Sequence, residues 1–205
     1  MIADAPMSDT LDAEPISAED RAALRESIRD VLQRHSDSAS VRAAITAPNR
    51  FDASLWSTLC AEIGVAALAI PESHGGAGAS FAETAVVLEE LGAALAPVPV
   101  YSSAVLATAA ILIAGDDDAS ARLLPDLASG DRIGTLAWAN SSGWCHAGVH
   151  AEAGLLTGSA SFVTDGDAAD TLLVLAAGPV GVTLHEIESG ADGVHVVALP
   201  TMDPT

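Results

Sequence analysis

Apolar side chains recur every three to four residues through the first 130 residues, the spacing of one face of a helix. Five helices are predicted, over residues 17–34, 51–64, 80–92, 98–114 and 116–130. Ser17 and Ser80 are the expected N-cap residues of the helices at 17–34 and 80–92. Gly64 and Gly92 are expected to end the helices at 51–64 and 80–92. The polar stretch at residues 35–40 interrupts the pattern, and no helix is assigned there.

The period changes after Gly130 to short runs rich in Val, Leu and Thr, divided by Gly and Asp turns. Six strands are predicted, over residues 132–139, 148–154, 155–166, 170–177, 181–188 and 193–200. No helical pattern separates them, which indicates a small antiparallel sheet or barrel. We therefore expect an α+β multidomain chain with a flexible tail (1–16), an all-α helical domain (17–130) and a β domain (131–205).

The stretch IPESHGGAG, residues 70–78, interrupts the helical half with one proline and three glycines. It follows a helix, whereas the dinucleotide fingerprint follows a strand, and the chain has no lysine for a Walker loop. A sharp turn whose glycines adopt positive φ, packed close against another backbone, is the favoured interpretation.

Charge excludes some partners. The formal net charge is −20, so nucleic acid and anionic membrane surfaces would repel the chain. The apolar run at 98–115 contains Pro99, two serines and a threonine, and is interpreted as a buried helix, not a membrane span. The N-terminus lacks a signal-peptide pattern and Cys60 and Cys145 form no CxxC pair, so a cytoplasmic protein with reduced thiols is expected.

The short clusters of polar residues in this sequence do not identify a reaction. The aspartates at 116–118 are interpreted as a helix cap, and His146 and His150 flank Gly148 in a loop-and-strand context that does not suit a helical metal pair. No metal site is predicted. Hydrolase chemistry has no support, because no G-x-S-x-G motif is present.

Longer stretches resemble the acyl-CoA dehydrogenase family. Residues 64–92 are similar to its N-terminal helical domain, with Pro-Glu, a Gly-Gly turn and an acidic helix ending in Leu-Gly. Residues 124–139 resemble its junction into the middle β domain, and residues 155–176 its next hairpin. The resemblance implies α,β-dehydrogenation of an acyl-CoA thioester by bound FAD, in fatty-acid or steroid side-chain metabolism. It also implies assembly into homo- or hetero-oligomers.

The resemblance assigns four residues to the flavin. Trp138 and Ala139 match a segment that runs near the ring and its edge. Phe162 matches the aromatic residue that flanks the isoalloxazine, and Thr164 matches the hydroxyl residue beside N5. A phenyl ring can stack on a flavin and a hydroxyl can hydrogen-bond to it.

Several family positions are altered, so that flavin binding is expected to be weak or lost. Ala139, Asn140, Cys145 and His146 replace the family's Thr, Glu, Ser and Asp, and Ala160 replaces its lysine. The resemblance places the catalytic glutamate in a C-terminal four-helix domain, which this sequence lacks. No catalytic residue is assigned here; Glu72, Glu89 and Glu90 are interpreted as solvated.

Three hypotheses follow. The chain is an incomplete acyl-CoA dehydrogenase-like flavoprotein, inactive alone. Alternatively, it is a non-catalytic partner subunit, as in the heteromeric actinobacterial enzymes whose divergent subunits it resembles. A third possibility is a scaffold or acyl-binding module without a redox role.

Overall fold

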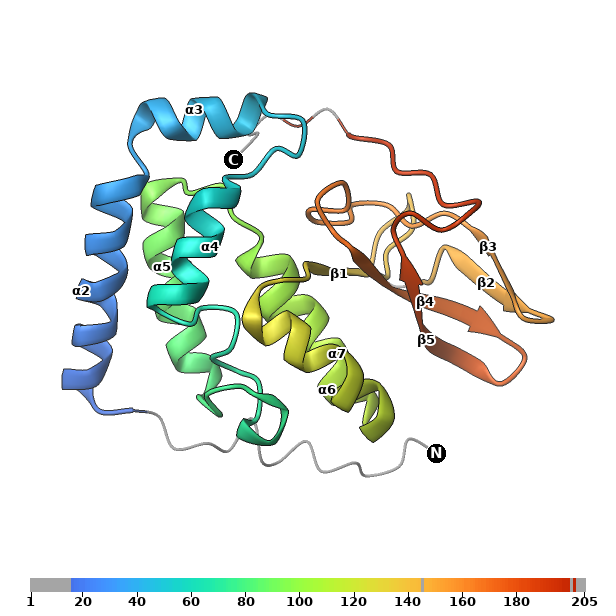
Figure 1. Cartoon of the computed structure of the whole chain (residues 1–205). Helices are drawn as coiled ribbons and strands as arrows, with labels where there is room; N and C mark the ends of the chain where they lie inside the picture. The colour runs from blue at the N-terminus through green and yellow to red at the C-terminus, as the bar shows by residue number, and fades with distance from the viewer. Residues whose placement is uncertain (1–15, 145, 200, 202–205) are drawn as a thin grey trace.

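The computed structural model describes residues 16–144, 146–199 and 201. Its helices precede its strands, so the predicted α-then-β order is confirmed (Figure 1). The predicted flexible tail, residues 1–16, lies outside the described residues except for Ile16. The helical elements are α2 (Ala18–His35), α3 (Ser38–Thr46), α4 (Ala53–Glu62), the 3₁₀ turn η1 (Glu72–His74), α5 (Phe81–Ala94), the π-helix η2 (Val100–Ala107), α6 (Thr108–Ala114) and α7 (Asp117–Ser129).

Capping side chains start three of these helices as predicted. The Ser17 hydroxyl accepts from the Asp20 N–H at 3.1 Å, and the Ser80 hydroxyl accepts from the Ala82 N–H at 3.1 Å. The Asp116 carboxylate accepts from the Ala119 N–H at 2.9 Å. Each bond satisfies an N–H that has no partner within its helix.

Two helix boundaries differ from the prediction. Helix α3 was missed, although Asp37 caps it by accepting from the N–H groups of Ala39 and Ser40. Helix α5 continues past Gly92 to Ala94 and ends on Leu95, whose φ is +51°. Gly64, by contrast, follows α4 with a φ of +73°, as expected for its stop.

The helix predicted at 98–114 begins at Val100, and its residues Val100–Ala107 form the π-helix η2, which continues into α6. Ser102 and Ser103 within η2 are 0% and 1% exposed. None of the described helices is long and apolar enough to cross a membrane.

The sheet contains β1 (Gly134–Ala137), β2 (Val149–Glu152), β3 (Leu155–Gly158), β4 (Thr171–Gly178) and β5 (Gly181–Glu188). Strand β4 is central. β5 pairs with one edge of it antiparallel, while β1 and β2 follow each other, parallel, along the other edge. β3 pairs antiparallel with β2.

The prediction of an all-antiparallel sheet is therefore wrong, because two of the four pairings are parallel. The β2–β3 hairpin and the loop after it serve as the crossover between β1 and β4, in place of a helix. The predicted strand at 155–166 is correct only for residues 155–158, which form β3, and the strand predicted at 193–200 is not found in the described residues. Residues 159–166 form a loop after β3, and residues 194–199 follow β5 without joining the sheet.

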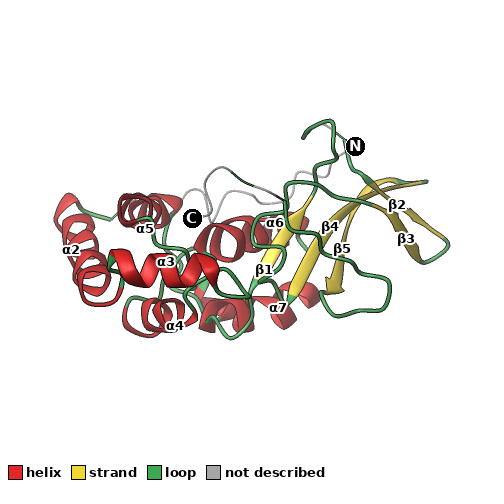
Figure 2. Cartoon of the chain, turned by 90° about the horizontal axis from the view of Figure 1, so that it is seen from above, coloured by secondary structure: helices red, strands yellow, loops and turns green. Residues whose placement is uncertain are grey.

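Side chains from both faces of β4 belong to apolar clusters shared with the helices. Leu173 of β4 belongs to an apolar cluster with Ile111 of α6 and Leu124 and Leu127 of α7. Helices α6 and α7 accordingly lie between the sheet and the group formed by α2, α4 and α5 (Figure 2). The opposite side chains of β4, Leu172 and Val174, face the groove described below.

The glycine-rich stretch at 70–78 is the compact turn that its sequence predicted. Gly75 and Gly78 have φ values of +83° and +61°. A Cβ on Gly76 would lie 1.9 Å from the carbonyl oxygen of Ile70, so this backbone approach requires glycine. The Gly78 N–H donates to the same carbonyl at 2.9 Å, which closes the turn.

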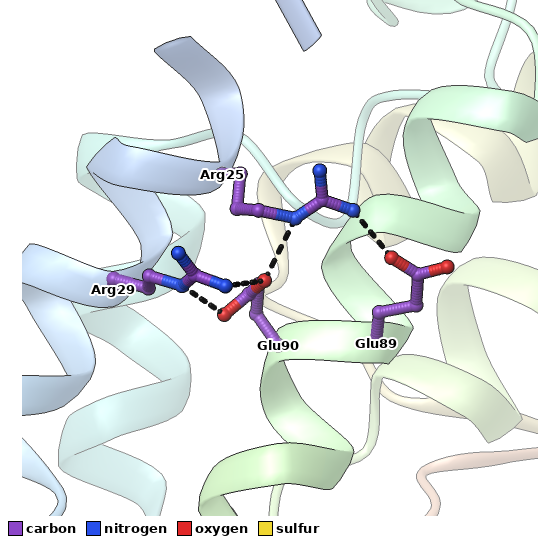
Figure 3. Close-up of polar contacts among 4 residues, drawn as sticks. All are labelled: Arg25, Arg29, Glu89 and Glu90. Carbon is purple, nitrogen blue, oxygen red and sulfur yellow. Dashed lines mark hydrogen bonds and ion pairs between the residues drawn. The ribbon is translucent and has the colours of Figure 1, made fainter. Parts of the chain in front are cut away.

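An ion-pair network joins α2 to α5 (Figure 3). Arg29 binds both carboxylate oxygens of Glu90, at 2.7 and 2.9 Å. Arg25 donates to Glu90 at 2.9 Å and also contacts Glu89. The interpretation of Glu90 as solvated is wrong, because its side chain is only 8% exposed.

Candidate functional site

A groove of about 1020 Å³ lies between the end of α5, the start of η2 and the sheet face that carries Leu172 and Val174. Leu91 and Tyr101 line it from the helical half. The remaining walls are the loop at residues 158–167 and the segment at residues 193–199. In Figure 1 this last segment runs back from the sheet toward α3. The walls combine apolar side chains with polar and charged ones, among them Arg50, Asp167 and His195. A concave groove with both kinds of surface is typical of a small-molecule site.

Two of the four predicted flavin residues, Phe162 and Thr164, line this groove. Phe162 is 49% exposed and has a φ of +58°, a left-handed conformation that is uncommon for an aromatic residue. The backbone carbonyl of Thr164 accepts from the Thr135 hydroxyl at 2.6 Å. The Thr164 hydroxyl itself forms no hydrogen bond with the described residues.

The other two residues, Trp138 and Ala139, lie beside the groove without lining it. Ala139 is 1% exposed, and its carbonyl accepts from the Ser161 N–H at 2.9 Å. The Trp138 ring lies 5.4 Å, centroid to centroid, from Trp144, which in turn lies 6.0 Å from Phe162. The fold thus brings the two segments together, but only the second faces the cavity.

Of the residues that differ from the family pattern, some line the groove and others lie away from it. Ala160 lines the groove, and Asn140 forms a turn by pairing with Gly143. His146 is exposed, and Cys145 lies outside the described residues. Of the glutamates considered for the base, Glu72, Glu89 and Glu90, none is among the described residues that line the groove.

Asp165 is a groove residue that the sequence did not reveal. Its carboxylate lies 2.6 Å from the Ser102 hydroxyl, and its φ is +51°. Burial raises the pKa of this carboxyl above its usual value, the Ser102 hydrogen bond partly opposes that rise, and the neighbouring Asp167 adds to it. Asp165 and Asp167 both belong to the sequence TDGD, residues 164–167, which is typical of a solvated turn. The local sequence therefore does not distinguish Asp165 from Asp167.

The groove's chemistry is compatible with a flavin ring. Phe162 contributes a half-exposed aromatic ring and Thr164 a hydroxyl without a hydrogen-bond partner among the described residues, while Val163 and Leu172 add apolar surface. These are the contacts that a planar, partly polar heterocycle requires.

Comparison with known proteins identifies the family of this chain. Residues 18–131 match the model of the acyl-CoA dehydrogenase N-terminal domain. The chain is 45% identical over 118 residues to the acyl-CoA dehydrogenase IpdE2 of Mycobacterium tuberculosis, covering 58% of this chain and 36% of that protein.

Solved structures of family members match as well. The ChsE4–ChsE5 complex from M. tuberculosis is 31% identical with a TM-score of 0.80, over 90% of this chain and 51% of that one. A variant of the Tcur3481–Tcur3483 steroid ACAD is 30% identical with a TM-score of 0.73, over 85% and 49%. The chain thus spans about half or less of the length of these relatives. From the domain match, the structural likeness and the groove, the chain belongs to the acyl-CoA dehydrogenase family.

Proposed function

We propose that this chain supplies the flavin-facing part of a site for α,β-dehydrogenation of an acyl-CoA thioester. The observation that carries the proposal is the loop bearing Phe162 and Thr164, which faces a groove of about 1020 Å³ in a member of this family. FAD, when bound, supplies the acceptor for the hydride that leaves the substrate.

The chain's own residues would bind and orient the cofactor. The Phe162 ring would pack against the isoalloxazine, and the Thr164 hydroxyl would hydrogen-bond to its polar edge. Trp138 and Ala139 would act from behind, since the Ala139 carbonyl binds the backbone of the Phe162 loop. In this proposal the helical domain (17–130) and the β domain (131–205) each form one wall.

The base that removes the α-proton would come from outside the described residues. The carboxylates that line the described part of the groove belong to Asp165 and Asp167. Asp165 is engaged by Ser102, and Asp167 lies 4.0 Å from Arg50. Neither is assigned as the base.

Purified protein titrated with FAD is expected to develop the flavin absorbance near 450 nm in the bound fraction. Phe162→Ala should raise the dissociation constant for FAD about two- to tenfold, because an aromatic contact of this kind is worth about 0.5–1.5 kcal/mol. Phe81→Ala is the matched control, since Phe81 is equally exposed, at 51%, but does not line the groove. If the wild-type protein binds no FAD, or if both variants weaken binding equally, the proposed flavin site is wrong.

A second candidate function is that of a non-catalytic partner subunit. It is favoured by the similarity to the ChsE4–ChsE5 complex and by the altered family positions. Co-expression with a complete acyl-CoA dehydrogenase chain would then yield a stable hetero-oligomer on size-exclusion chromatography. Failure to bind FAD together with capture of that chain would select this function over the first, whereas FAD binding by a homo-oligomer would contradict it.

A further inference from the structure

The loop that carries Phe162 and Thr164 is held in an unfavourable backbone conformation. Phe162 and Asp165 both have positive φ, +58° and +51°. A non-glycine residue in this region is strained and persists only where surrounding contacts impose the conformation. The contacts that hold Phe162 and Asp165 in this conformation also determine where the loop lies at the groove.

The two ends of the loop are held by the Ser159 N–H, which donates to the Gly148 carbonyl at 3.1 Å, and by Asp167, which lies 4.0 Å from Arg50. Three hydrogen bonds hold residues 161–165 between them. Two connect the loop to the sheet half: the Ser161 N–H donates to the Ala139 carbonyl, and the Thr164 carbonyl accepts from the Thr135 hydroxyl. The third connects it to the helical half, because the Asp165 carboxylate binds the Ser102 hydroxyl at 2.6 Å. These last two residues are 63 positions apart in the sequence.

Three consecutive side chains of the π-helix η2 contact three different parts of the protein. Tyr101 lines the groove, the Ser102 hydroxyl meets Asp165, and the Ser103 hydroxyl accepts from the Gly134 N–H at 3.1 Å. Ser102 is fully buried, so a hydroxyl there without a partner would be costly. π-Helical turns are uncommon and are often found at functional sites. In this one, two consecutive serines join the helical half to the start of β1 and to the flavin-facing loop.

The Ser102 hydroxyl has a single proton, which limits the hydrogen bonds that it can form with Asp165. Its oxygen lies 3.2 Å from the Pro99 carbonyl and 2.6 Å from Asp165 Oδ2, but a hydroxyl has one proton to donate. The Ser102 hydroxyl donates to Asp165, the shorter of the two contacts, and the Pro99 carbonyl is the more distant acceptor. An asparagine could make the same bonds, whereas an alanine could make none.

We propose that Asp165 is a positioning residue whose hydrogen bond with Ser102 latches the loop at 159–167 onto η2 and so fixes Phe162 and Thr164 at the groove. The effect on FAD rests on the proposed function. The latch itself does not, because it can be measured in the protein without cofactor.

The test compares Ser102→Ala, Asp165→Ala and Asp165→Asn in the full chain. Ser120→Ala is the control, since it removes a buried serine from α7, outside the groove lining. Amide hydrogen exchange of residues 161–165 and the dissociation constant for FAD are measured, with Tm as a check on global stability.

Ser102→Ala and Asp165→Ala are each expected to speed exchange in residues 161–165 and to weaken FAD binding, both about tenfold. Asp165→Asn and Ser120→Ala should stay within about twofold of the wild type. The double variant Ser102→Ala/Asp165→Ala should be no worse than either single one, because both remove the same bond.

Unchanged exchange at 161–165 in both alanine variants would overturn the latch. Additive effects in the double variant would also overturn it, because the two residues would then not act through one shared bond. So would an Asp165→Asn variant as impaired as Asp165→Ala, because the charge of Asp165 and not its hydrogen bond would then be required. If wild-type protein binds no FAD, the proposed function fails and exchange alone decides the latch.

Discussion

Replacing Gly76 with alanine is expected to destabilise the protein by about 3 kcal/mol and to lower Tm by roughly 6–12 °C. The new Cβ would lie 1.9 Å from the Ile70 carbonyl oxygen and 2.5 Å from the Ile70 Cβ. Ile70 is fully buried against the cluster formed with α6 and α7, so it has no room to move away. Thermal unfolding followed by circular dichroism measures the change.

Gly92→Ala is the matched control for Gly76→Ala. Gly92 lies inside α5, and a Cβ there would have no neighbour within 4 Å. Alanine is expected to stabilise this helix by about 0.5–1 kcal/mol, because it restricts the unfolded chain without a clash. A Gly76→Ala protein that unfolds within about 2 °C of the wild type would contradict the close approach at Ile70.

Replacing Glu90 with glutamine is expected to destabilise the protein by about 2 kcal/mol at neutral pH. Glu90 is 8% exposed, whereas its partners Arg25 and Arg29 are 32% and 56% exposed. The effect should therefore lie between that of a surface ion pair, about 0–1 kcal/mol, and that of a buried one, about 3–5 kcal/mol. Glu89→Gln is the control: Glu89 is 65% exposed, contacts Arg25 only, and should change stability by less than about 0.5 kcal/mol.

The Glu90 effect should depend on pH. The hydrogen bond from Arg29 holds the pKa of Glu90 below its usual value, burial opposes this, and Arg25 lowers the pKa further. The folded protein thus binds the proton less tightly than the unfolded chain. Glu90 stabilises the fold fully above the unfolded pKa, near 4.5, and this contribution is lost as pH falls through the folded pKa.

Urea unfolding of wild type and Glu90→Gln between pH 7 and pH 3 tests this dependence. The two proteins should differ most at neutral pH and converge in acid. A difference that stayed constant with pH would show that packing, and not the carboxylate charge, is what Glu90 contributes.

Local chemistry was enough to predict most of the helical half. Ser17, Ser80 and Asp116 start helices because each side chain satisfies an N–H two or three residues ahead, which requires no distant partner. The turn at 70–78 was predictable for the same reason, since positive φ and close backbone approach both select glycine. The missed helix α3 also had a local signal, the Asp37 cap, which the polar composition around it obscured.

Resemblance to the family, and not periodicity, singled out Phe162 and Thr164, and the structure places both at the groove. The same resemblance could not reveal that Trp138 and Ala139 lie beside the groove without lining it. That depends on how the two segments pack, with Ala139 buried behind the loop.

The sequence by itself determined the helix starts, the glycine turn, the order of helices before strands and the strongly acidic charge. Only the tertiary structure decided that β1 and β2 run parallel to β4, that residues 159–166 form a loop, and that Asp165 meets Ser102. The reason is physical: alternation of apolar side chains is the same in parallel and antiparallel strands, and a hydrogen bond between residues 63 positions apart exists only once the helical and sheet halves have packed together.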